Sequence, residues 1–272
     1  MARLPRSLGD IVARLARPVR TGWPVALTGV LVEKPRWARV ELGGVPAVQT
    51  DESSCGSACL VMLAATGDEV LAEWLETGVL PKGLQIDELP PEIPANALVD
   101  TPGAAGRFAA AQRAVKESTS FRAVGPLPWP RRLGTLPWAA ARVARFPGVR
   151  YVHRPVDDRG DSGREMLSLV LNALGHGYPV LLYSGGTRSS GWTTALPRHV
   201  LLAVPAGERR VTPEGTPIIS IYEPHSGRVF EVPANELADR TEPSPALGHW
   251  SNIQWLVLPV PATSTRFPEE TT

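Results

Sequence analysis

The sequence predicts an α+β protein, in which a mainly helical first half packs against an antiparallel sheet formed by the second half. Two observations favour this fold class. A cysteine in the first quarter of the chain is followed by an apolar stretch of helix length, and the last third contains several short apolar runs bounded by turn residues. The 272 residues are 43% hydrophobic and 20% charged, which is typical of a folded globular chain.

Helices are predicted where apolar residues recur with helical spacing between capping and stop signals. The clearest is residues 53–66, where Ser53 or Ser54 is expected to cap the start and the apolar content indicates a central, buried helix. Thr135 and Ser162 are expected to cap two later helices. The other predicted helices cover residues 5–20, 68–77, 106–116, 136–145 and 164–174.

Strands are predicted from apolar runs that are shorter than a helix and end at turn residues. Ala206-Gly207 and Ser226-Gly227 are two of these turns. Residues 25–32 and 36–42 are weaker strand candidates. The main predicted strands cover residues 179–183, 199–204, 218–222, 228–232 and 253–258.

The chain is expected to have one main domain, residues 45–262, with an extension over residues 1–44 and a flexible tail over residues 263–272. The short helix in the extension is expected to pack on the domain, or else to bind a membrane surface or a partner. Residues of about 80–160 are rich in proline and tryptophan. Because a structureless segment of this length is unusual in a compact domain, a helical insertion that forms one wall of a cleft is expected there.

Composition and charge argue against several classes of protein. A formal net charge of +1, with arginines spread along the chain, argues against a nucleic-acid binder. No apolar stretch approaches the roughly 20 residues needed to cross a bilayer, and the N-terminal region lacks the apolar block of a signal peptide. The sequence therefore predicts a cytoplasmic protein with no integral membrane segment and no cofactor.

Cys55 lies at the expected start of the helix over residues 53–66. The partial positive charge and free N–H groups of a helix N-terminus favour a thiolate, so Cys55 is predicted to be a nucleophile, the alternative being an inert buried thiol. Gln49, six residues earlier, could donate a side-chain N–H to an oxyanion together with the backbone N–H of Cys55, or it could be a solvated loop residue. Cys59, one helical turn after Cys55, is expected in the core. A disulfide does not suit this spacing, and without a second cysteine pair no metal site is predicted.

His199 begins one of the predicted strands and is the candidate general base, the alternative being a buried structural histidine. His225 would be the substitute base. Glu223 is the candidate for orienting the imidazole of His199. Asn235, Asn252 or a backbone carbonyl are the alternatives for that role.

Together these residues resemble the papain-like cysteine peptidase clan, and most closely its bacterial branch of bacteriocin-processing, double-glycine peptidases. The likeness covers residues 45–75 and 162–260. The order of cysteine, histidine and acidic residue agrees with the family, which usually has Asp or Asn at a position like that of Glu223. The motifs that carry the likeness are Gln49-x5-Cys55-Gly56, Gly177-Tyr-Pro179-Val180, and Arg198-His199-Val200 followed by Tyr222-Glu223-Pro224.

The resemblance implies that Cys55, His199 and Glu223 are catalytic and that Gln49 stabilises an oxyanion. The activity implied is a cysteine hydrolase that cleaves a peptide or related amide bond of a peptide or protein substrate through an acyl-thioester. A transamidase or deamidase using the same pair, or a binding or assembly module that has lost catalysis, are the alternatives. The transporter-linked members of the family carry an ATPase with a phosphate loop, and this chain has no Gly-x-x-x-x-Gly-Lys motif.

Overall fold

The structure is a computed structural model of the chain. The helix expected at residues 5–20, most of the strand candidate at 25–32 and the tail at 263–272 lie outside the residues that it describes. The described residues are 30–31, 37–98, 103–186, 197–206 and 210–262.

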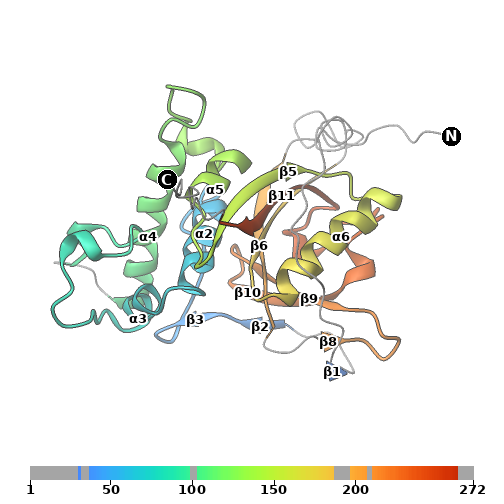
Figure 1. The fold of residues 1–272 in the computed structure, drawn as a ribbon, viewed down its shortest axis with the longest axis horizontal. Helices are drawn as coiled ribbons and strands as arrows, with labels where there is room; N and C mark the ends of the chain where they lie inside the picture. Colours follow the sequence, from blue (N-terminus) through green and yellow to red (C-terminus); the bar gives the residue numbers. More distant parts are fainter. Residues whose placement is uncertain (1–29, 32–36, 99–102, 187–196, 207–209, 263–272) are drawn as a thin grey trace, which may run out of the picture.

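A seven-stranded antiparallel sheet lies at the centre of the described fold (Figure 1). The strand order is β2-β10-β9-β7-β6-β11-β5. The predicted α+β class and the five main predicted strands are confirmed. The strands of this sheet are β2 (Trp37–Arg39), β5 (Val149–Pro155), β6 (Val180–Gly185), β7 (His199–Val204), β9 (Ile218–Glu223), β10 (Arg228–Pro233) and β11 (Asn252–Pro261). Two short pairs join β1 (Val30–Leu31) to β8 (Arg210–Val211) and β3 (Glu41–Leu42) to β4 (Val45–Pro46).

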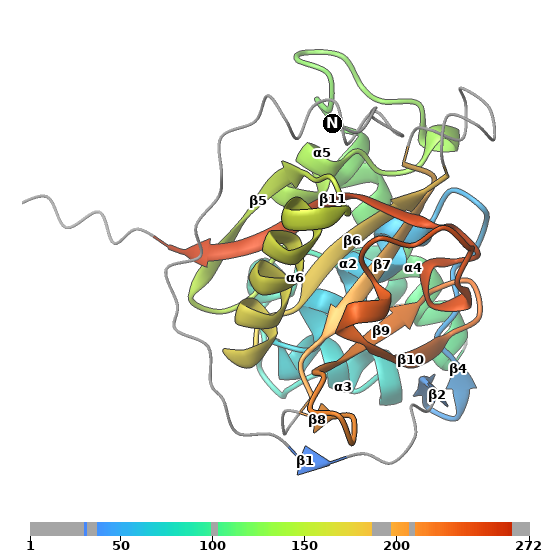
Figure 2. The ribbon, with the colours of Figure 1, turned by 90° about the vertical axis from the view of Figure 1, so that its right-hand side faces the viewer.

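Helices cover both faces of the sheet, and Figure 2 shows α6 in front of the strands with α2 and α3 behind them. Successive residues of a strand point to opposite faces, so Leu202 of β7 packs in the core with α2 whereas Leu201 packs in the core with α6. Because both faces are covered, β6 and β9 are buried along their whole length. The helices are α2 (Cys55–Ala65), α3 (Glu69–Thr77), α4 (Gly103–Ser120), α5 (Pro137–Val143) and α6 (Gly160–Gly175).

The expected helix caps at Thr135 and Ser162 are wrong, although both helices are present. Leu136 holds the cap position of α5. Arg159 holds that of α6, so Ser162 lies inside the helix. Ser54 does occupy the cap position of α2, but its side chain makes no bond to the helix because the preceding loop uses the hydroxyl.

Strand β5 was not predicted. It lies in the stretch expected to be a helical insertion, which does contain α4 and α5 but ends in this strand. β5 pairs along its length with β11, from Trp255 opposite Pro155 to Pro261 opposite Val149. Its proline and two arginines obscure the alternation of buried and exposed residues that marks an edge strand.

The segment just before α2 is fixed to the sheet. The hydroxyl of Tyr222 in β9 donates a 2.8 Å hydrogen bond to the carbonyl of Ala47. Two residues later, the backbone N–H of Gln49 donates to the carbonyl of Pro224, also at 2.8 Å. The chain that leads into α2 therefore runs beside the turn that follows β9.

In the described part of the chain, no single helix has the length and apolar character needed to cross a bilayer. Only α2 and α3 taken together would meet that test, and they meet at a bend of 116°.

Tyr222→Phe is expected to lower the free energy of unfolding by about 1 kcal/mol, because a buried hydrogen bond is lost and the carbonyl of Ala47 loses its donor. Urea unfolding followed by tryptophan fluorescence measures this as a lower midpoint with an unchanged slope. An unchanged midpoint would mean that this bond does not hold the segment to the sheet.

Candidate active site

Cys55 is the first residue of α2, and the first turn of this helix has no side-chain cap. The hydroxyl of Ser54 instead donates to the carbonyl of Asp51 and accepts from the N–H of Asp51, both at 2.8 Å. The positive end of the helix dipole is therefore not offset by a cap and acts on Cys55. Only 4% of Cys55 is exposed.

Cys59 joins α2 to the strand that carries His199. Its thiol donates a 3.3 Å hydrogen bond to the carbonyl of Val200, the residue that follows His199. Cys59 has no exposed surface, and burial raises the pKa of its thiol well above the usual value. The prediction that Cys59 belongs to the core is confirmed.

His199 is the first residue of β7, in the middle of the sheet. Its Nε2 lies 2.7 Å from Oε1 of Glu223, and the side chain of Cys55 lies near enough to the ring to raise its pKa. Burial alone would lower the pKa of the imidazole. The hydrogen bonds and negative charge of Cys55 and Glu223 outweigh burial and raise the pKa of His199 to about 9. These contacts therefore favour the cationic form of the ring.

Glu223 ends β9 and is held by the turn that follows it. Its two carboxylate oxygens accept backbone N–H groups from His225 and Ser226, each at 2.8 Å, in addition to the bond with His199. Burial would raise the pKa of this carboxyl. The hydrogen bonds from His199, Ser226 and His225 outweigh it and lower the pKa to about 2. An ionised carboxylate is thus fixed beside the imidazole.

The alternatives to this pairing are not found. The amide of Asn252 donates to the carboxylate of Asp158 at 3.1 and 3.2 Å, and Asn235 is exposed. His225 donates its backbone N–H to the carboxylate of Glu223, and His225 is itself exposed to solvent. Among the described residues, Glu223 is the partner that orients the ring of His199.

Gln49 lies close to the start of α2, but its amide bonds within its own loop. Nε2 donates to the carbonyl of Asp51 at 2.8 Å, and Oε1 is buried without a hydrogen-bond partner among the described residues. One hydrogen of Nε2 remains for another acceptor. The role of Gln49 as an oxyanion donor stays a prediction.

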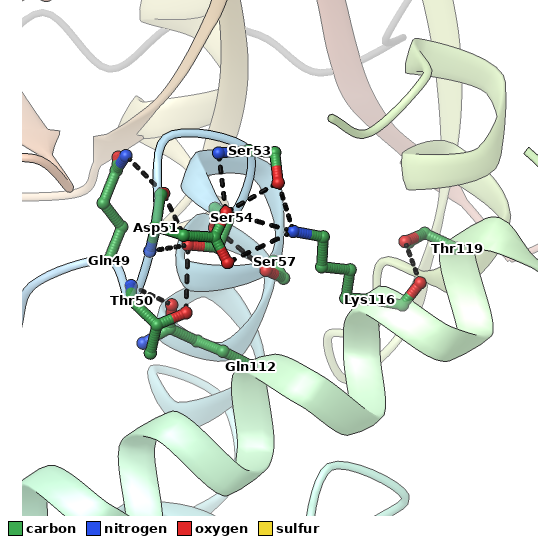
Figure 3. Close-up of polar contacts among 9 residues, drawn as sticks. All are labelled: Gln49, Thr50, Asp51, Ser53, Ser54, Ser57, Gln112, Lys116 and Thr119. Atoms are coloured by element: carbon green, nitrogen blue, oxygen red, sulfur yellow. Dashed lines mark hydrogen bonds and ion pairs between the residues drawn. The ribbon is translucent and has the colours of Figure 1, made fainter. Parts of the chain in front are cut away.

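Helix α4 holds this loop at two points, as Figure 3 shows. The amide of Gln112 accepts from the N–H of Thr50 at 3.1 Å and donates to the carbonyl of Val48 at 3.2 Å. One turn later, the ammonium of Lys116 lies 3.2 Å from Oδ1 of Asp51. Both sides of the backbone at Gln49 are thus fixed by one side chain, that of Gln112.

The charged end of this contact also involves Ser53, whose Oγ bonds to both Lys116 and Asp51. Partial burial would raise the pKa of Asp51, but the bonds from Ser53 and Lys116 lower it. The sequence reasoning missed Gln112 and Lys116. The available signal was an amide among the apolar residues of a helix, at Gln112 between Ala111 and Val115.

The side chain of Thr135 packs against the first turn of α2 and does not cap α5. A Cβ atom on Gly56 would lie 2.6 Å from Cβ of Thr135 and 2.7 Å from its Oγ1. The residue after Cys55 must therefore lack a side chain for this contact to form.

Within the described ranges, no three His, Cys, Asp or Glu side chains gather as a metal site would require.

No protein-family model matches this chain, and no curated protein sequence matches it.

The free energy of unfolding is expected to depend on pH through His199 and Glu223. The raised pKa of His199 contributes stability that is full below pH 6.5 and is lost as the pH rises through about 9. The lowered pKa of Glu223 contributes stability that is full above pH 4.5 and is lost as the pH falls through about 2. Chemical unfolding across this range is expected to give a maximum between pH 4.5 and 6.5.

Glu223→Gln is expected to remove the acid limb of that profile and to make the alkaline limb shallower. His225→Ala is the control, because His225 bonds to Glu223 only through its backbone. Its profile should match the wild type. Equal profiles for wild type and Glu223→Gln would contradict the pairing.

Gln112→Leu keeps most of the side-chain volume but leaves the N–H of Thr50 and the carbonyl of Val48 without their partner. We expect a loss of about 1–3 kcal/mol in the free energy of unfolding. Hydrogen exchange should also become faster at the Thr50 amide. Arg113→Leu on the exposed side of α4 is the control. Unchanged exchange at Thr50 would contradict the clamp.

Proposed function

We propose that this protein is a cysteine hydrolase of the papain-like type, which cleaves a peptide or related amide bond. The observation that carries the proposal is the 2.7 Å contact between Nε2 of His199 and Oε1 of Glu223. Glu223 and the nearby Cys55 together raise the pKa of the imidazole to about 9. A cationic imidazole bonded to a sulfur stabilises that sulfur as a thiolate, which is the nucleophilic form. The uncapped start of α2 acts in the same direction.

The first half of the proposed reaction is acylation. The Cys55 sulfur attacks the carbonyl carbon, a C–S bond forms, and the electron pair of the C=O bond moves to oxygen. The C–N bond then breaks, and the imidazolium of His199 gives its proton to the leaving amine. The products of this half are a thioester on Cys55, the free amine and a neutral imidazole.

The second half is hydrolysis of that thioester. The neutral imidazole of His199 takes a proton from water as the water oxygen attacks, and the C–S bond breaks to release the acid. The cationic imidazole and the thiolate are thereby restored. Glu223 keeps the ring in one orientation through both halves, because its carboxylate is itself fixed by two backbone N–H groups.

The oxyanion formed in each half requires hydrogen-bond donors near the sulfur. The N–H of Cys55 and the second Nε2 hydrogen of Gln49 are the proposed donors. Helix α4 supports this arrangement because Gln112 and Lys116 fix the loop that carries Gln49. An amine in place of water would give transamidation by the same steps, and a side-chain amide as substrate would give deamidation.

A second candidate function follows from the burial of the nucleophile. With 4% of Cys55 exposed, a substrate carbonyl has a narrow approach to the sulfur. This observation favours a papain-like binding or assembly module that no longer catalyses. The ionised, doubly anchored Glu223 favours the hydrolase, because a module without catalysis has no need to hold a buried carboxylate against an imidazole.

Iodoacetamide at pH 6 is expected to alkylate Cys55 rapidly, because a thiolate paired with an imidazolium persists below the pH at which ordinary thiols react. Peptide mass spectrometry locates and times the modification. Cys55→Ala should abolish labelling, and the fully buried Cys59 on the same helix should stay unlabelled in the wild type. Slow labelling that rises only above about pH 8 would refute the hydrolase.

Hydrolysis itself is tested by incubating the wild type with a peptide library in water enriched in oxygen-18. New carboxyl groups that carry the heavy oxygen report hydrolysis, and Cys55→Ala is the inactive control. A wild type with a reactive Cys55 but no cleavage would favour the non-catalytic module or the transfer reactions.

A further inference from the structure

A closed loop over residues 244–250 lies against the candidate base. The N–H of Ser244 donates to the carbonyl of Trp250 at 3.0 Å, which joins the two ends of the loop. Its tip is fixed to the sheet, because the buried hydroxyl of Ser184 donates to the carbonyl of Leu247 at 2.9 Å. Ser184 is the residue paired with His199 across β6 and β7. The loop is thus anchored on the direct neighbour of the imidazole.

Gly248 is the point at which this loop meets the ring. A Cβ atom at position 248 would lie 2.8 Å from Nε2 and 3.0 Å from Cγ of His199, and closer still to Cδ2. These three adjacent atoms form one side of the imidazole, so the added carbon would press on the ring itself. A ring that turned away from this carbon would weaken its contacts with Glu223 and Cys55.

The backbone conformation does not by itself explain the glycine. Gly248 has φ of +64°, in the region that favours glycine, but the next residue, His249, has φ of +65° and carries a side chain. The loop therefore tolerates a non-glycine residue in this conformation. What distinguishes position 248 from position 249 is the contact with His199.

We propose that Gly248 is a positioning residue for His199. Its bare backbone lets the loop press on the imidazole and keep Nε2 toward Glu223 and the ring beside Cys55. This inference rests on the proposed function, because it concerns the thiolate–imidazolium pair of that site. A methyl group at position 248 turns the ring and separates it from at least one of its two partners.

The test measures the pH dependence of iodoacetamide alkylation at Cys55 in the wild type, Gly248→Ala, Ser184→Ala and Gly125→Ala. Gly125 is the matched control, because it has φ of +60° with no atom within 4 Å of an added Cβ. Gly248→Ala is expected to slow alkylation at pH 6 by about 10- to 100-fold and to move the profile toward that of an ordinary thiol. Ser184→Ala, which only releases the loop from Leu247, is expected to move it in the same direction by less.

The controls separate strain from positioning. Gly125→Ala carries the same backbone strain and should keep the wild-type profile, and thermal unfolding of each variant reports loss of folding. If Gly248→Ala does not fold, Ser184→Ala decides by its shift at pH 6. A wild-type profile in a folded Gly248→Ala variant would overturn the proposed role of Gly248 and leave the proposed function standing. If Gly248→Ala does not fold, a wild-type profile in Ser184→Ala would do the same. A wild type that itself behaves as an ordinary thiol would overturn the proposed function, and this inference with it.

Discussion

The packing of α2 on β7 is the contact on which the site depends. The thiol of Cys59 bonds to the carbonyl of Val200. Cys55 lies one helical turn before Cys59, and His199 is the residue before Val200. The helix and the strand are therefore in register at the point where the thiol and the imidazole meet. Since both elements are buried, this register is set by the core and not by the polar groups.

Polar contacts then hold the two sides of the site separately. On the helix side, α4 fixes the loop before Cys55 through the buried amide of Gln112. On the sheet side, the turn after Glu223 fixes the carboxylate, and the loop at Gly248 limits the ring of His199. Cys55, Glu223 and His199 are thus each supported by a different part of the chain.

Local pattern was sufficient for β7 and β9, because each is a continuous apolar run and both faces are buried. It also placed Cys55 at a helix start. It could not place Gln112, which matters only because α4 crosses the loop at Thr50. The same limit applies to Ser54, which holds the cap position of α2 without a side-chain bond to the helix, because the backbone of Asp51 takes its hydroxyl. Strand β5 was missed because its identity comes from pairing with β11.

The acid–base pair and the thiol belong to different layers of the fold. His199 and Glu223 lie on neighbouring strands, β7 and β9, whose separation is fixed by ladder hydrogen bonds, whereas Cys55 lies on a helix held mainly by side-chain packing. Packed helices can slide past a neighbouring layer by small amounts. A small shift of α2 against the sheet would therefore move the sulfur away from the imidazole while the imidazole and the carboxylate stayed together. The reactivity of the Cys55 thiol thus depends on how closely the helical layer packs on the sheet.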